Sequence, residues 1–274
     1  MVGITIDEAL CKRDGLCVAI CPLQLILPAD DGGVPAPGPE FSRWCIRCGH
    51  CVAICPTGAL RHFRMGPEQC PEIDSKTGPG PEEIAALLRR RRSVRRFKAA
   101  VPERGVLEQL VGLAGYAPSG HNLKSLKWMI FTGRKSLDRF VDRACDWMKA
   151  ELERNPTSPQ APLLRKVTAA WAAGDDLILH RAPVLMLVHG PTRTGSETSD
   201  AALALAYFDL ASSGHGLGCC WAGLLEMAIR SWKPLQELVA LPEGHKLRGA
   251  MVAGYPRYEF RRIPWRSTPK IEWR

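Results

Sequence analysis

The sequence has no long hydrophobic run. Its most apolar stretches, residues 183–188 and 201–208, are far shorter than the roughly 18 residues that a membrane-spanning helix needs. The first ten residues also lack the positive charge and the continuous apolar segment of a secretory signal, since Asp7 and Glu8 stand there. We therefore expect a cytoplasmic protein that neither crosses a membrane nor is exported.

Several classes of functional motif are also missing. Residues 81–274 contain no nucleophile triad, no Walker loop and no metal-binding histidine pair. The net charge of +9 is concentrated there, because residues 1–80 carry seven Lys+Arg against nine Asp+Glu and the remainder carries 30 against 19. No nucleic-acid motif accompanies this basic surplus, so we expect no nucleic-acid partner. Anionic cofactors, acidic electron donors or a solvated surface explain it as well.

Cysteine, by contrast, is abundant and clustered. Seven of the eleven cysteines lie within residues 11–55. In a reducing compartment such thiols stay free, and closely spaced thiolates then bind soft metals. The other four, Cys70, Cys145, Cys219 and Cys220, lack ligand spacing, and we expect them to be linker or core residues.

Residues 45–56 follow the spacing C-x2-C-x2-C-x3-C-P, which is that of bacterial ferredoxins. The spacing makes Cys45, Cys48, Cys51 and Cys55 the firmest candidate ligands. A C-x2-C pair alone would equally suit zinc, but a closed zinc site usually draws its ligands from separated pairs, whereas these cysteines form one run. The segment therefore predicts iron–sulfur binding.

Residues 11–22 repeat this pattern, with the same Val-Ala-Ile-Cys-Pro ending and with Asp14 in place of the second cysteine. Residues 1–64 thus resemble a two-cluster bacterial ferredoxin, in which the cysteine before proline reaches the other cluster. The implied ligands are Cys21, Cys45, Cys48 and Cys51 for one 4Fe-4S cluster, and Cys11, Cys17 and Cys55 for the other. Asp14 is either a ligand of this second cluster or an ordinary polar loop residue. Because carboxylate is a harder ligand than thiolate, the second cluster could take a 3Fe-4S form.

Glycine and proline mark a boundary after this segment, over residues 65–81. We expect a ferredoxin-like domain over residues 1–64, a linker over 65–81 and a second domain over 82–274. Helices are expected over residues 81–92, 102–117, 135–152, 161–173 and 197–213. Short strands are expected over residues 127–132, 183–188, 217–221 and 249–253. The pattern predicts an α+β protein whose helices pack on a central sheet.

The second domain carries short motifs in a particular order. They are Arg-x-Ser-x-Arg-x-Phe at residues 91–97, Pro-Ser-x-x-Asn at 118–122, Gly-Leu-Gly at 216–218, Trp-x-Gly at 221–223, Leu-Pro-Glu-Gly at 241–244 and Gly-Tyr-Pro at 254–256. Each is weak alone, but their joint order resembles the FMN-dependent nitroreductase family. The resemblance implies a homodimer and an α/β sandwich with a central mixed sheet, fused here to the ferredoxin-like segment.

The resemblance also implies which residues hold FMN. Guanidinium groups bind phosphate in a bidentate manner, so Arg91, Arg92 and Ser93 suit the phosphate contacts. Arg95 matches a basic position near the flavin pyrimidine edge, where a cation stabilises negative charge on the reduced ring. The other implied contacts are Pro118, Ser119, Gly120, His121, Asn122, Lys124, Trp221, Ala222, Gly223, Arg262 and Arg266. Lys124 stands where many members have Gln, the match of the C-terminal tail is loose, and His121 could equally be a hydrogen-bonding support.

Together these features predict an FMN-dependent, nitroreductase-like oxidoreductase. A low-potential donor would pass electrons through two clusters to FMN, which would reduce a nitroaromatic, quinone-like or other electron-poor small molecule. One alternative is an NAD(P)H-dependent nitroreductase with a regulatory ferredoxin segment. Another is an electron-transfer or redox-sensing adaptor whose partner is a protein.

Overall fold

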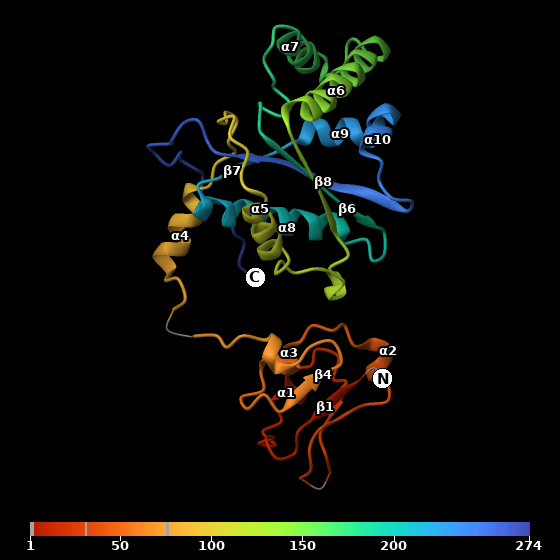
Figure 1. Ribbon diagram of the computed structural model, residues 1–274, viewed down its shortest axis with the longest axis vertical. Helices are drawn as coiled ribbons and strands as arrows, with labels where there is room; N and C mark the ends of the chain where they lie inside the picture. Colours follow the sequence, from red (N-terminus) through yellow and green to blue (C-terminus); the bar gives the residue numbers. More distant parts are fainter. Residues whose placement is uncertain (1–2, 31, 75–76) are drawn as a thin grey trace. The chain divides into compact units, whose positions relative to one another are not determined.

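The computed structural model describes residues 3–30, 32–74 and 77–274. The chain divides into two compact units, the first formed by Met1–Pro79 with His121–Leu123 and the second by Gly80–Gly120 with Lys124–Arg274 (Figure 1). Each unit has its own hydrophobic core.

The first unit is built from very short elements. Strand β1 (Ile4–Ile6) pairs antiparallel with β4 (Leu60–His62), and β2 (Ile26–Leu27) pairs antiparallel with β3 (Ala36–Pro37). The helical elements are α1 (Leu16–Ala19), α2 (Phe41–Trp44), α3 (His50–Ala53) and the 3-10 turn η1 (Pro67–Gln69). A small buried core joins them, consisting of Ile4, Leu25, Ile26, Phe41, Val52 and Leu60.

The two halves of the cysteine repeat share one backbone conformation. Arg13 and Arg47 have φ values of 56° and 55°, and Gly15 and Gly49 have φ values of 72° and 78°. Helices α1 and α3 begin directly after these glycines. Positive φ favours glycine, and at Gly49 a Cβ atom would also lie 2.6 Å from Sδ of Met65. The repeated sequence thus produces a repeated loop.

A four-stranded sheet in the order β5-β6-β8-β7 lies at the centre of the second unit (Figure 1). Its strands are β5 (Lys127–Thr132), β6 (Val184–Pro191), β7 (Gly218–Trp221) and β8 (His245–Gly254). The three strand pairings are antiparallel, and the parallel component of the expected mixed sheet is an isolated bridge between Ser93 and Cys219. The α+β class predicted from the sequence is confirmed.

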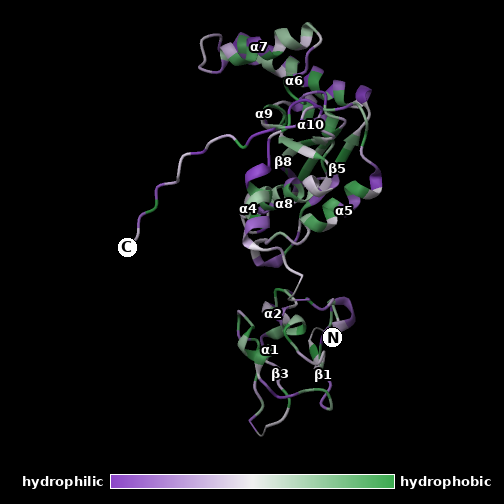
Figure 2. Ribbon diagram, turned by 90° about the vertical axis from the view of Figure 1, so that its left-hand side faces the viewer, coloured by the Kyte–Doolittle hydropathy of each residue, from purple (hydrophilic) through white to green (hydrophobic). Residues whose placement is uncertain are grey.

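Successive side chains of the central strands face two separate cores. In β6, Leu185 and Leu187 belong to one cluster, whereas Val184, Met186 and Val188 belong to the other. Side chains of a strand point alternately to opposite faces, so a strand buried on both faces is continuously apolar. This explains the unbroken hydrophobic sequence of β6. Figure 2 shows much hydrophobic, green ribbon at the centre of the second unit, near the labels of β8 and β5.

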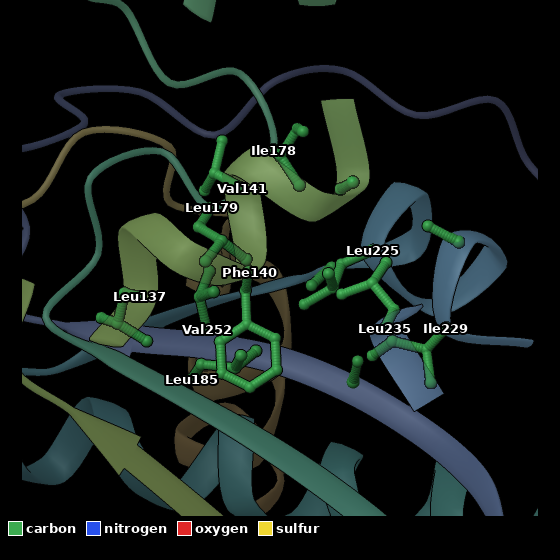
Figure 3. Packing of buried hydrophobic residues seen from close by; sticks show 14 of the residues in the cluster. Leu137, Phe140, Val141, Ile178, Leu179, Leu185, Leu225, Ile229, Leu235 and Val252 are labelled. Atoms are coloured by element: carbon green, nitrogen blue, oxygen red, sulfur yellow. The ribbon is translucent and has the colours of Figure 1, made fainter. Parts of the chain in front are cut away.

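Helices cover both faces of this sheet. The first core includes residues of α6 (Arg134–Arg154), α7 (Ala161–Ala172), α9 (Gly223–Ser231) and α10 (Lys233–Val239). Figure 3 shows how Phe140 of α6 meets Leu185 of β6 and Val252 of β8, with Leu225 of α9 on the same side of the sheet. The second core includes residues of α5 (Arg104–Ala114) and α8 (Glu197–Ser212).

Helix α4 (Pro81–Arg90) opens the second unit with the start signal read in the sequence. Pro81 occupies the first turn, and Oε2 of Glu83 accepts a hydrogen bond of 2.8 Å from the N–H of Gly80. A carboxylate there satisfies a free N–H group and interacts favourably with the helix dipole. Two 3-10 turns, η2 (Gly120–Asn122) and η3 (Ser213–His215), complete the element list.

The strand predicted over residues 127–132 is confirmed, and β5 begins and ends at these residues. The five predicted helices are also present. The sequence does not predict α9 and α10, because they are short and separated only by Trp232. Strand β8 begins at His245 rather than at residue 249, because polar side chains at its start interrupt the apolar pattern. Among the described helices, none has the length and apolar character needed to cross a membrane.

Adjacent leucines of α7 offer a direct test of this packing. Leu164 is 3% exposed and belongs to the first core, whereas Leu163 is 48% exposed. We expect Leu164→Ala to lower the free energy of unfolding of the second unit by about 2–5 kcal/mol, because it removes buried contacts and leaves a cavity. Leu163→Ala is the matched control and should cost far less. Urea unfolding followed by circular dichroism measures both, and equal midpoints would contradict the assignment.

Candidate functional site

The cysteines of the first unit fall into two groups. Burial raises the pKa of Cys45, and the neighbouring thiolates of Cys48 and Cys21 raise it further. Burial likewise raises the pKa of Cys51 to about 11, again with Cys48 and Cys45 as charged neighbours. Cys21 is therefore a spatial neighbour of the Cys45 loop, although it belongs to the upstream half of the repeat.

These four sulfurs surround one cavity. Its walls include Cys21, Cys45, Cys48 and Cys51 together with apolar side chains such as Leu25 and Phe41. No three Cys, His, Asp or Glu side chains in the described parts of the chain converge closely enough to hold a single metal ion. A cubane takes one thiolate on each of four irons, which keeps the sulfurs farther apart than around zinc. Four cysteines on one cavity are the number of ligands that a 4Fe-4S cluster needs.

The second group contains Cys11, Cys17 and Cys55. Burial raises the pKa of Cys17, and the thiolates of Cys11 and Cys55 act on it as close negative charges. Burial alone would also raise the pKa of Cys55, but N–H groups around it, beginning with that of Thr57, donate to its sulfur and lower the pKa below the usual value. The three sulfurs are grouped as the repeat predicts.

Asp14 occupies the loop of this second group. Its side chain is exposed, and Oδ1 accepts a hydrogen bond of 3.1 Å from the N–H of Leu16 at the start of α1. An Asx turn of this kind explains the residue without any metal. Iron ligation by Asp14 stays a prediction.

His62 is a residue of this region that the sequence analysis missed. It lies at the end of β4, is 3% exposed and lines the cavity of the Cys45 group. Its Nε2 atom lies 3.6 Å from Sγ of Cys45. No cysteine motif includes a histidine at this spacing, so only the folded chain reveals the contact.

The second unit contains a large cavity lined by arginines. Arg91, Arg92 and Arg262, which were expected at the FMN phosphate, all line it, as do Arg90 and Arg261. Five guanidinium groups on one cavity suit an anionic ligand such as a phosphate. Arg266 is not among the lining residues, which leaves it as a prediction from the sequence alone.

The segment carrying Arg91 is held against the sheet. The N–H of Val94 donates to the carbonyl of Cys219 in β7 at 2.9 Å, and Ser93 forms a bridge to the same residue. Arg91 Nη1 lies 3.3 Å from Oδ2 of Asp209 in α8. Asp209 is 7% exposed, and burial raises its pKa while Arg91 opposes that shift. The sequence offered no signal for Asp209.

Arg95 lies beside two further titratable groups. Burial raises the pKa of Cys220, and Arg95 opposes that shift by charge and by a hydrogen bond. Burial lowers the pKa of His180, with Arg95 contributing in the same direction, and Nδ1 of His180 is buried without a hydrogen-bond partner. The charge of Arg95 thus acts on His180, whose Nδ1 atom has no hydrogen-bond partner, and the place of Arg95 at the flavin stays a prediction.

The predicted flavin loop after α5 has an unusual backbone. His121, Asn122 and Lys124 have φ values of 50°, 52° and 45°, which are uncommon for residues other than glycine. The N–H of Lys124 donates to Oγ of Ser119 at 3.2 Å, and the N–H of Gly120 donates to Oδ1 of Asp200 at 3.1 Å. These bonds hold the loop in a conformation that would otherwise cost energy, as often occurs at functional sites.

Not all predicted flavin contacts gather at the arginine cavity. Residues 118–124 and 221–223 are absent from its lining. His121–Leu123 group with the first unit, and Nδ2 of Asn122 donates to the carbonyls of Ile46 and Arg47 at 3.2 and 3.0 Å. The cavity therefore collects Arg91, Arg92 and Arg262 but not Ser93, Arg95 or Arg266. Trp221 is 42% exposed.

The fold and these sites are those of a flavoprotein-like α+β sandwich preceded by a dicluster segment. Residues 88–255 match the nitroreductase family, and residues 9–60 match the 4Fe-4S dicluster domain. The first match covers more than half of the chain, so the chain belongs to the nitroreductase family. Both resemblances read from the sequence are confirmed.

Individual relatives agree with this assignment. The chain is 26% identical over 170 residues to an iodotyrosine deiodinase of Thermotoga neapolitana, across 62% of this chain and 87% of that protein. A nitroreductase with bound FMN from Bacteroides fragilis aligns with a TM-score of 0.57 at 19% identity, over 69% of this chain and 99% of that one. An iodotyrosine deiodinase bound to FMN and 3-iodo-L-tyrosine aligns with a TM-score of 0.55 at 23% identity, over 70% of this chain and 98% of that one. The structural matches establish the fold of the second unit.

Removing Cys21 tests the grouping of the sulfurs. We expect Cys21→Ala to lose roughly one to four irons per chain from the cluster of the Cys45 loop, because the iron that Cys21 would bind is left without a ligand. Cys70→Ala is the matched control, since Cys70 also packs against the core of this unit. Iron and sulfide analysis with electron paramagnetic resonance measures the result. Loss confined to the other cluster would contradict the grouping.

Proposed function

We propose that the chain is an FMN-dependent oxidoreductase in which electrons from a low-potential donor pass through two iron–sulfur clusters to FMN and on to an electron-poor small molecule. One observation carries the proposal, namely that a single chain combines two thiolate groups with an arginine-lined cavity in a nitroreductase fold. FMN, when bound, supplies both one-electron and two-electron chemistry, which suits single-electron carriers upstream and a two-electron product downstream.

The residues around the arginine cavity fit this cofactor. Arg91, Arg92 and Arg262 would bind the phosphate, and Asp209 would orient Arg91 through the ion pair already present. Arg95 would place a positive charge near the ring, beside the unsatisfied Nδ1 of His180. A fixed cation there favours reduction because it stabilises the negative charge that the ring gains.

The expected substrate is an electron-poor aromatic compound. The nitroreductase family and the iodotyrosine deiodinase relative both point to acceptors whose ring takes up electrons, such as nitroaromatics, quinones and halogenated phenols. Fold alone does not choose among them, because acceptor specificity depends on the residues that cover the flavin. A panel of these three classes is the appropriate screen.

We also propose a homodimer. Helix α4 exposes Ile84, Leu87 and Leu88, and the C-terminal segment exposes Phe260 and Trp265. Large apolar side chains exposed together mark surfaces that bind another protein. A second copy of the chain would bury them and complete the flavin site, as the resemblance to nitroreductases implies.

Arg91 gives a cofactor test that separates phosphate binding from general damage. We expect Arg91→Ala to weaken FMN binding about 10- to 100-fold, because a charge-assisted hydrogen bond to phosphate is lost. Binding of riboflavin, which has no phosphate, should change little. Arg89→Ala is the control, since Arg89 lies in the last turn of α4, two residues before Arg91, and is outside the cavity lining. Fluorescence titration measures both affinities of the wild-type protein and of each variant, and equal losses for FMN and riboflavin in Arg91→Ala would refute the phosphate role.

Anaerobic stopped-flow spectroscopy tests the direction of electron flow. Reduced methyl viologen should bleach the clusters before the flavin, and NADPH should reduce the flavin only slowly. Rapid flavin reduction by NADPH in a variant without clusters, such as Cys45→Ala with Cys55→Ala, would favour an NAD(P)H-dependent enzyme with a regulatory ferredoxin segment. A purified protein without FMN would favour a redox-sensing adaptor.

A further inference from the structure

His62 is held rigidly at the cavity of the Cys45 group. It is 3% exposed, its ring centroid lies 4.3 Å from that of Phe63, and it pairs with Ile4 across the β1–β4 ladder. The ring therefore has little freedom to turn, and its two nitrogens face defined partners.

Hydrogen bonding selects the tautomer of this ring. The main-chain N–H of Arg64 donates to Nδ1 of His62 at 3.1 Å, so Nδ1 is an acceptor and carries no proton. The proton of the neutral ring then lies on Nε2.

Among the described residues, the Nε2 proton has one acceptor within reach. Sγ of Cys45 lies 3.6 Å from Nε2, a normal separation for an N–H group and the larger sulfur atom. Cys45 is the first cysteine of the ferredoxin spacing and one of the four sulfurs around the cavity. The imidazole thus reaches a sulfur that, under the proposed function, is an iron ligand.

We infer that His62 is a positioning residue that donates its Nε2–H to the Cys45 thiolate and thereby raises the reduction potential of the cluster held by Cys21, Cys45, Cys48 and Cys51. This inference rests on the proposed function, because it requires the cluster. An added electron increases the negative charge on the ligand sulfurs, and a hydrogen-bond donor stabilises that charge. Arg64 acts indirectly, since its N–H fixes the tautomer.

The second group of sulfurs has a different side-chain partner. Oγ1 of Thr57 lies 3.8 Å from Sγ of Cys55, and within the described residues no imidazole hydrogen-bonds to Cys11, Cys17 or Cys55. A substitution of His62 should therefore change the reduction potential of one cluster and leave the reduction potential of the other unchanged. This selectivity separates tuning from a general loss of structure.

Two substitutions of His62 distinguish the effect of the hydrogen-bond donor from the effect of the ring itself. His62→Phe keeps a planar ring and removes the donor, whereas His62→Gln keeps an N–H group near the position of Nε2. Redox titration of the anaerobically purified full chain, followed by electron paramagnetic resonance, should show a negative shift for the Phe variant. The equilibrium constant for reduction of this cluster should fall about tenfold. For a one-electron couple this is a change in reduction potential of about 59 mV. The Gln variant should stay near the wild-type value.

Controls make the outcome decisive. Ile73→Val alters an exposed side chain of the same unit that does not line the cavity, and it should leave both potentials unchanged. An unshifted Phe variant, or equal shifts for Phe and Gln, would overturn the inference.

A measurement on the wild-type protein covers the case in which the Phe variant loses its cluster. With 15N-histidine labelling, pulsed resonance should detect one imidazole nitrogen coupled to the reduced cluster, and its absence would overturn the inference. Protein without iron would instead refute the proposed function.

Discussion

Sulfur atoms from two separate loops meet around each cluster position, and the first unit depends on them. Its strands are two or three residues long, and its buried core holds six hydrophobic side chains. A core of that size contributes little to the stability of the folded unit, and small domains of this kind use metals as cross-links. Burial and neighbouring thiolates raise the pKa of Cys51 to about 11, a penalty that positive iron, when bound, would offset. Cluster binding would therefore be coupled to folding.

The second unit is organised by a different constraint. Its sheet is buried on both faces, and β7 lies at the sheet edge, where it fixes the arginine segment through Val94 and Cys219. Asp209, nearly buried in α8, pairs with Arg91 and limits the directions that its guanidinium can take. A buried carboxylate is costly without such a partner. The pair thus links the packing of the core to the cavity that would hold an anionic cofactor.

Much of the fold and the grouping of the cysteines could be predicted, because the relevant signals are local in the sequence. The duplicated cysteine spacing predicts which sulfurs group together, and the positive φ values at Gly15 and Gly49 show why each loop needs a glycine. His62 and Asp209 could not be predicted, because their partners lie 17 and 118 residues away and no motif connects them. The lining of the cavity by Arg90 and Arg261 escaped prediction for the same reason, since it arises from packing.

The central claim is that one chain carries two clusters and one flavin. The most direct test is the iron, sulfide, zinc and FMN content of protein purified without oxygen. We predict about seven or eight irons, about eight sulfides and one FMN per chain, the lower iron number corresponding to a three-iron form at the Asp14 loop. Zinc in place of iron, iron near four, or the absence of FMN would contradict the account.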